Sequence, residues 1–105
     1  MSDLKAQQEG RSEMSYQYEA EKAALFTDEG QRNFLKVRDF CHRMLEQAGA
    51  VRADKAMSQW GSGGSSWTML AALDRLVELG ELREVVVPGG SWGQYRVFVD
   101  GRDSR

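Results

Sequence analysis

The sequence predicts one small α+β domain, mainly α-helical, in which three helices precede a C-terminal β-hairpin. Three observations favour this fold class. The 105 residues suit a single domain and leave no room for two packed ones. Apolar residues recur at helical spacing in two runs, and a glycine follows each run. Towards the C-terminus, two runs rich in β-branched residues flank a glycine-rich segment, which is the pattern of a hairpin.

Residues 1–25 are predicted to form an acidic and largely disordered arm before the domain. They carry three basic and five acidic side chains, and as far as residue 15 they hold too few large apolar side chains to offset the entropy of ordering. The state of residues 15–25 stays open, because a weak helical stripe of Tyr16, Ala20, Ala23, Ala24 and Leu25 forms only if another element covers it. The domain is predicted over residues 26–100, with a polar tail at 101–105.

The first secure helix is predicted to begin at Thr27 or Asp28, which are both good N-caps, and to end at Gly49. Its apolar spacing predicts a buried face made of Phe34, Val37, Cys41, Met44, Leu45 and Ala48. The opposite face carries three cations, Arg32, Lys36 and Arg43. Because Asp39 interrupts these cations, we expect a solvated face rather than a binding site.

Shorter elements are predicted around the second long helix. They are an extended bridge at 50–52, a short helix at 53–60, a turn at 61–64, and hairpin strands at 82–87 and 94–99 joined by a six-residue tip. The glycine-rich turn has no Lys-Ser/Thr pair, so it does not match a phosphate-binding loop. Trp60 is expected to pack over the elbow between the helices.

The second long helix is predicted to begin after a cap at Ser65 or Ser66 and to run to Leu79, where Gly80 closes it. One stripe is predicted to be buried, and it contains Met69, Leu73, Leu76 and Val77, with Leu70 at its edge. Helical projection turns six other residues outward, namely Trp67, Thr68, Ala71, Asp74, Arg75 and Glu78.

The order helix, strand, helix, turn, helix and hairpin resembles the winged helix-turn-helix superfamily over about residues 26–99. The most specific stretch is 67–83, whose pattern consists of apolar Met69, Leu73, Leu76 and Leu79, then Gly80 and apolar Leu82. Small bacterial and phage proteins of unassigned role look similar. The resemblance implies a winged helix fold in which the third helix and the hairpin wing carry the function, as in members that place this helix in the major groove of DNA.

The resemblance therefore implies a nucleic-acid-binding or transcription-accessory protein that binds double-stranded DNA weakly, in a salt-sensitive way and as a dimer. The expected contacts are Ser65, Ser66, Thr68, Arg75, Arg96 and Lys55. The charge opposes this function. The chain has a net charge of −2, and acidic residues outnumber basic ones over residues 65–87, which is the wrong sign for a phosphate backbone.

The alternative is a protein-interaction or dimerisation module that keeps the same fold and does not bind DNA. In this hypothesis the third helix and the wing present an apolar surface to a partner. The residues expected on that surface are Trp67, Leu70, Ala71 and Trp92. The apolar and acidic character of the third helix favours this alternative, whereas the family resemblance favours DNA.

Other classes of function have little support in the sequence. No set of residues suggests a catalytic site or a cofactor, so we expect no enzyme. The single cysteine, Cys41, and the single histidine, His42, cannot make a structural zinc site, and no disulfide is possible within the chain. There is no secretion signal and no apolar run of membrane-spanning length, which predicts a cytoplasmic protein.

Overall fold

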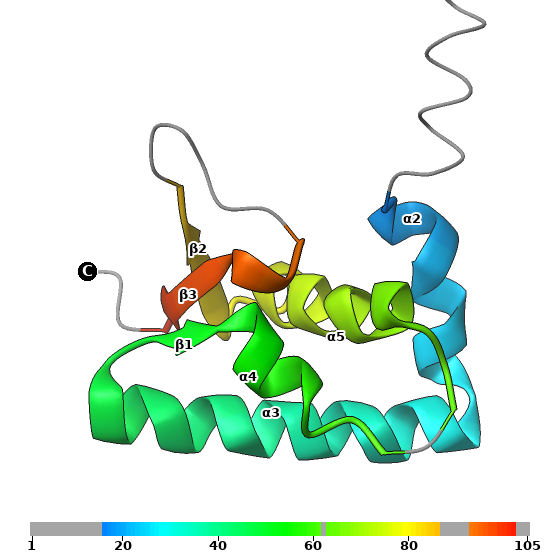
Figure 1. Cartoon of the computed structure of the whole chain (residues 1–105), viewed down its shortest axis with the longest axis horizontal. Coiled ribbons are helices and arrows are strands. Elements are labelled where there is room, and N and C mark those ends of the chain that lie inside the picture. The colour runs from blue at the N-terminus through cyan, green and yellow to red at the C-terminus, as the bar shows by residue number, and fades with distance from the viewer. Residues whose placement is uncertain (1–15, 62, 87–92, 103–105) are drawn as a thin grey trace, which may run out of the picture.

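The computed structural model describes residues 16–61, 63–86 and 93–102 (Figure 1). In chain order they form α2 (Tyr18–Glu21), the 3-10 helix η1 (Lys22–Phe26), α3 (Asp28–Ala48), β1 (Val51–Arg52), α4 (Ala53–Met57), α5 (Ser66–Glu78), β2 (Leu82–Val85), the 3-10 helix η2 (Gly93–Tyr95) and β3 (Val97–Asp100). The prediction of an α+β domain that is mainly helical is confirmed.

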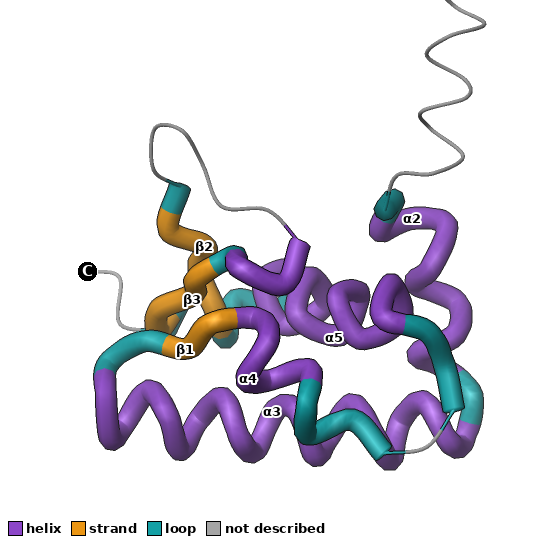
Figure 2. The backbone as a smooth tube through the Cα atoms, in the orientation of Figure 1, coloured by secondary structure: helices purple, strands orange, loops and turns teal. Residues whose placement is uncertain are grey.

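The three strands form one small antiparallel sheet in the order β1-β3-β2. Val51 lies opposite Phe98, and Leu82 lies opposite Asp100. Val51, Leu82 and Phe98 are buried, which means that one face of the sheet closes the core. Figure 2 shows the strands gathered at one end of the molecule, above α3.

The second hairpin strand begins later than predicted. Residues Gly93–Tyr95 form η2 instead of strand, and β3 starts only at Val97. Gly93 has a φ of 51°, which a continuous strand does not allow, and the turn lets the Arg96 carbonyl accept a 2.7 Å hydrogen bond from the Ala53 amide. Residues 87–92, which include most of the predicted tip, lie outside the described residues.

Helix α3 has the predicted bounds because a capping residue lies at each of its ends in the sequence. The Thr27 hydroxyl accepts a 2.9 Å hydrogen bond from the Gly30 amide at the start, and Gly49 ends the helix with a left-handed φ of 81°. The buried face differs from the prediction at its margins. Ala48 is exposed, whereas Asn33 is buried and accepts a 3.0 Å hydrogen bond from the Gly61 amide.

Helix α5 also begins as predicted, with Ser65 as its cap. The Ser65 hydroxyl accepts from the Thr68 amide at 3.3 Å, and the Thr68 hydroxyl accepts from the Ser65 amide at 3.4 Å. The predicted outward face is wrong in part. Thr68 is only 5% exposed and Ala71 is fully buried. Helix α4 is shorter than predicted and ends at Met57.

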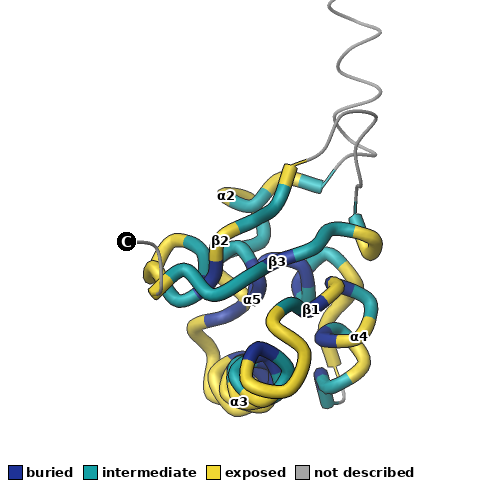
Figure 3. Tube along the Cα trace, turned by 90° about the vertical axis from the view of Figure 1, so that its left-hand side faces the viewer, coloured by how far each residue is buried: buried dark blue, intermediate teal, exposed yellow. Residues whose placement is uncertain are grey.

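The core lies between α3, α5 and the inner face of the sheet. Its largest fully buried side chains are Phe98, Leu25, Leu73, Leu76, Val37 and Cys41. Trp60 is 8% exposed and its indole donates a 2.8 Å hydrogen bond to the Gly63 carbonyl, which confirms its predicted packing role. Figure 3 views α3 nearly end-on, with its exposed residues turned away from the other elements.

The N-terminal segment, which we define as residues 16–26, is part of this domain. It forms α2 and η1, and Figure 1 shows it rising from the start of α3 at one end of the molecule. Both helices contact α5. Because Leu25 is fully buried, the question left open by the sequence is answered. A covering element exists, because α2 and η1 pack against α5.

The burial of Cys41 gives a first test of the core. Its thiol is fully buried, and burial raises its pKa to about 12. Because the thiolate is the reactive form, we expect no reaction with an aromatic disulfide reagent at neutral pH in the native protein and complete reaction in denaturant. The release of the coloured thiol measures this, and fast reaction of the native protein would contradict the placement of Cys41.

Candidate functional site

One face of α5 meets the N-terminal segment. We call it the α5 face and define it by Ala71, Asp74, Arg75 and Glu78, which share one side of the helix because they are spaced by three and four residues. Ala71 is fully buried although no core-facing periodicity predicts it. Since α2 and η1 contact α5, the N-terminal segment covers this face.

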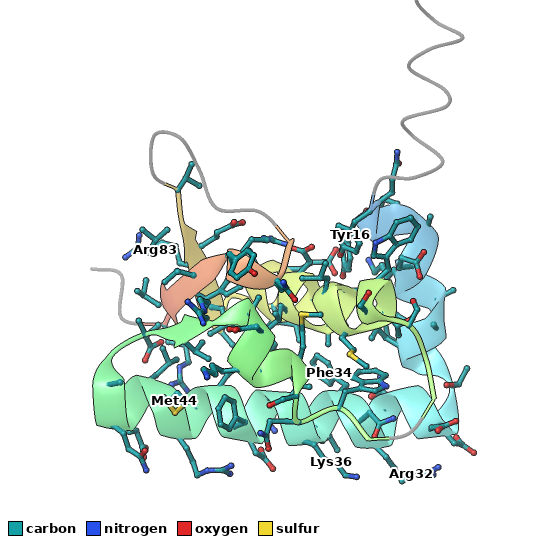
Figure 4. All side chains as sticks on the ribbon, viewed as in Figure 1. Tyr16, Arg32, Phe34, Lys36, Met44 and Arg83 are labelled. Carbon is teal, nitrogen blue, oxygen red and sulfur yellow. The ribbon has the colours of Figure 1, made fainter. Side chains whose placement is uncertain are left out.

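Two tyrosines and a lysine of the segment bind the two carboxylates of the α5 face. The Tyr16 hydroxyl donates to Asp74 Oδ2 at 2.6 Å, and the Tyr18 hydroxyl donates to Glu78 Oε1 at 2.6 Å. Lys22 Nζ lies 3.0 Å from Glu78 Oε2. Figure 4 shows Tyr16 beside α5. Two of the acidic residues that oppose DNA binding in this sequence, Asp74 and Glu78, are therefore acceptors for the N-terminal segment.

Apolar contacts accompany these polar ones. Leu25 enters the core from η1, and the Arg75 guanidinium lies 5.3 Å from the centre of the Phe26 ring, which remains 53% exposed. A pocket of about 130 Å³, partly open to solvent, lies between the end of η1, the start of α3 and the turn after Trp60, and its lining includes Ala24, Gly30 and Gly64.

The hydrogen bonds change the proton affinities of the groups that make them. Burial first, and then the bond to a carboxylate, raises the pKa of the Tyr16 and Tyr18 hydroxyls well above their usual range. Hydrogen bonds from Tyr18, Lys22 and Arg75 lower the pKa of Glu78 to about 2. At neutral pH the tyrosines are therefore neutral donors and Glu78 is a charged acceptor.

The lowered pKa of Glu78 predicts that acid releases α2. A carboxyl group with a depressed pKa stabilises the folded state above its unfolded pKa, and this contribution disappears as the pH falls towards the folded value. We expect the ring resonances of Tyr18 to move towards those of a free tyrosine between pH 4.5 and pH 2.

The Glu78→Gln variant is the matched control for this titration, because it keeps an acceptor oxygen and removes the ionisation. It should lose the Glu78 part of the transition. A Glu78 carboxyl carbon that titrates near pH 4.5 in the wild-type chain, as in an unstructured peptide, would contradict the contacts with Tyr18 and Lys22.

Arg96 lies next to the α5 face and pairs with the carboxylates of Asp74 and Glu84. Its Nη2 lies 2.7 Å from Asp74 Oδ1 and 2.8 Å from Glu84 Oε1, and its Nε donates to Glu84 Oε2 at 3.0 Å. The Arg96 side chain is only 13% exposed. Tyr16 and Arg96 therefore bind the same carboxylate, and through Asp74 the N-terminal segment is linked to the sheet.

The residues predicted to contact DNA do not form one exposed basic surface. Thr68 is buried, and Arg96 is paired with Asp74 and Glu84. Arg75 lies 3.0 Å from Glu78. Ser65 caps α5 with its hydroxyl, so the exposed members whose side chains have no such role are Ser66 and Lys55.

The residues predicted for a protein partner are largely inside the domain. Leu70 and Ala71 are buried, and Trp67 is half-buried and packs against the core. Trp92 lies outside the described residues. Instead, the side chains that contact the α5 face are Tyr16, Tyr18, Lys22 and Phe26, and Leu25 of the same segment enters the core. Of these residues, the weak helical stripe in the sequence contains only Tyr16 and Leu25.

The remaining charged residues of α3 and the possible metal ligands provide no second candidate site within the described residues. Arg32 and Lys36 are exposed and point away from α3 in Figure 4, as expected of a solvated face. His42 Nε2 lies 2.8 Å from Glu81 Oε1 and links α3 to the turn after α5. Within the described residues, no group of three or more His, Cys, Asp or Glu side chains could hold a metal ion. No helix in the described part of the chain is long and apolar enough to cross a membrane.

The chain was compared with protein-family models, with curated proteins and with solved structures. None of them matches it. The α5 face and its contacts are therefore the basis for any assignment of function.

Proposed function

We propose that this chain is a protein-interaction module whose α5 face binds a short amphipathic helical segment carrying tyrosine and lysine. One observation carries the proposal. The face holds such a segment already, because residues 16–26 of the chain occupy it with Leu25 buried and with Tyr16, Tyr18 and Lys22 on Asp74 and Glu78. An apolar anchor flanked by polar contacts is a common way for a groove to bind a helix.

We also infer a winged helix arrangement for the domain. The element order α3, β1, α4, α5, β2 and β3 and the strand order β1-β3-β2 support it. In this arrangement α5 is the third helix and the pair β2–β3 is the wing. The α5 face then corresponds to a surface that DNA-binding members turn towards the groove.

The charges explain why a protein segment suits this face better than DNA. Asp74 and Glu78 are acceptors, so they match hydroxyl and ammonium donors and repel phosphate. Arg96, the cation next to them, already has two carboxylate partners. DNA binding through Ser65, Ser66, Thr68, Arg75, Arg96 and Lys55 stays a prediction with weaker support.

A labelled peptide tests the proposal on the full chain. The probe is a fluorescent peptide with the sequence of residues 16–26, and its anisotropy is followed as protein is added. In the wild-type chain the tethered segment competes at high effective concentration, so the peptide should bind poorly. The Tyr16→Phe/Tyr18→Phe chain loses both phenol donors, and we expect it to bind the peptide several-fold more tightly than the wild-type chain does.

Two controls make this result specific. A peptide with phenylalanine at both tyrosine positions should bind the same variant more weakly than the original peptide does. Random-sequence duplex DNA at low salt, where nonspecific binding is strongest, should leave the α5 amide resonances unchanged. Failure of the peptide to bind either chain, or salt-sensitive shifts of α5 with DNA, would overturn the proposal.

A further inference from the structure

The N-terminal segment is joined to α3 by one non-helical residue. Thr27 has extended backbone angles, with φ −85° and ψ 165°. η1 ends at Phe26 on one side of it, and α3 begins at Asp28 on the other. A change at Thr27 alone therefore reorients the whole segment relative to the rest of the domain.

The local sequence supports two conformations of this segment, because Thr27 is a good N-cap for the bent form and the residues before it are good α-helix formers. Residues Lys22–Phe26 form a 3-10 helix of five residues, although lysine, alanine and leucine are strong α-helix formers. A 3-10 stretch of this length is uncommon and often marks a hinge or a strained sequence. Residues 18–48 contain no proline and one glycine, Gly30, so a continuous helix through Thr27 competes with the bent form.

Three small interactions hold the bend. The Thr27 hydroxyl accepts from the Gly30 amide at 2.9 Å and donates to the Ala24 carbonyl at 3.2 Å. Gln31 Nε2 donates to the Leu25 carbonyl at 2.6 Å. A Cβ atom at Gly30 would collide with the Ala24 carbonyl oxygen, so the bend also requires the absence of a side chain at this position.

A continuous helix would remove the segment from its own α5 face. At 1.5 Å per residue, Tyr18 would lie about 15 Å beyond Asp28 along the axis of α3. Asp74, Glu78 and the part of the core that Leu25 fills would then be exposed to solvent. Residues 16–26 are the segment that the structure shows on the α5 face. When these residues of one chain are released, the same residues of a second chain can bind in their place.

We propose that residues 16–26 exchange between two copies of the chain, with Thr27 as the hinge, so that the α5 face of each copy binds the segment of the other. This inference rests on the proposed function, because it requires the α5 face to bind the segment in trans. The same side chains would contact Asp74 and Glu78 in both forms, and the backbone differs only at Thr27 and in η1, which is why such exchange is a low-cost route to a dimer.

Two hinge variants of the full chain test the exchange. Thr27→Ala removes the cap and raises helix propensity, so it favours the continuous helix. Asp28→Pro locks the bend, because proline suits the first helical position, keeps the residue before it extended and disrupts a continuous helix. Gly30→Ala, which forces the collision with Ala24, is a second opening variant.

Mass measured by light scattering over a range of protein concentrations is the first readout. We expect a monomer of 11.8 kDa for Asp28→Pro at every concentration. The wild-type chain should shift towards twice this mass as its concentration rises, and Thr27→Ala and Gly30→Ala should do so at lower concentrations. In a mixture of isotope-labelled and unlabelled Thr27→Ala chains, filtered spectra should show contacts between the Tyr18 ring of one copy and α5 of the other.

Equal masses for Thr27→Ala and Asp28→Pro at all concentrations would overturn the exchange. A dimer whose Tyr18 contacts stay within one chain would also overturn it. Neither result affects the peptide assay, which measures binding by the α5 face directly. Peptide binding with a monomeric Thr27→Ala chain refutes the exchange alone, whereas loss of peptide binding refutes the proposed function.

Discussion

Replacement of Leu25 by alanine is expected to lower the free energy of unfolding by about 2–5 kcal/mol. Leu25 is fully buried although it lies in residues 15–25, whose state the sequence leaves open. Removal of its side chain leaves a void in the core, and a rigid core relaxes only partly around such a void. Denaturant titration of the full chain measures the change.

Leu35→Ala is the matched control for this prediction. It removes the same atoms from a leucine on α3 that is 46% exposed, and surface changes of this kind stay within about 0.5 kcal/mol. If Leu25→Ala were no more destabilising than Leu35→Ala, residues 16–26 would not cover α5 in solution.

Replacement of Arg96 by methionine is expected to destabilise the fold by about 2–4 kcal/mol. The substitution leaves Asp74 and Glu84 close together without their shared cation. We place the loss towards the lower end of the range for buried pairs, because the Glu84 side chain is 29% exposed and water screens part of the repulsion. Thermal or denaturant unfolding at neutral pH measures it.

A second set of changes identifies the cause of that loss. Adding Asp74→Asn and Glu84→Gln to the Arg96→Met chain removes the unpaired charges, so more than half of the stability should return. Arg83→Met, at an exposed position on β2, should change stability by less than about 0.5 kcal/mol. If Arg96→Met were neutral, Arg96 would be free in solution, as the DNA prediction requires.

The long helices could be predicted because the signals that define them are local. Thr27 and Gly49 bracket α3, and Ser65 opens α5, each within one turn of the backbone groups that it satisfies. The apolar spacing of α3 identified Phe34 and Cys41 as core residues by the same local logic.

The surface of α5 could not be predicted in this way, because projection shows which residues share a face and not what covers them. Thr68 and Ala71 are buried although projection turns them outward. Tyr16 meets Asp74 across 58 residues, and Arg96 meets Asp74 across 22. Among residues 16–25, which are the part of the arm that the structure describes, Leu25 is the one that is fully buried, and the sequence placed it only on a weak helical stripe.

The central claim is that the N-terminal segment occupies the α5 face. Nuclear Overhauser contacts in the full wild-type chain at neutral pH test it most directly. We expect contacts from the Tyr16 and Tyr18 rings and from the Leu25 methyl groups to protons of α5. If these contacts were absent while those between α3 and α5 persisted, the α5 face would be open and the account would be wrong.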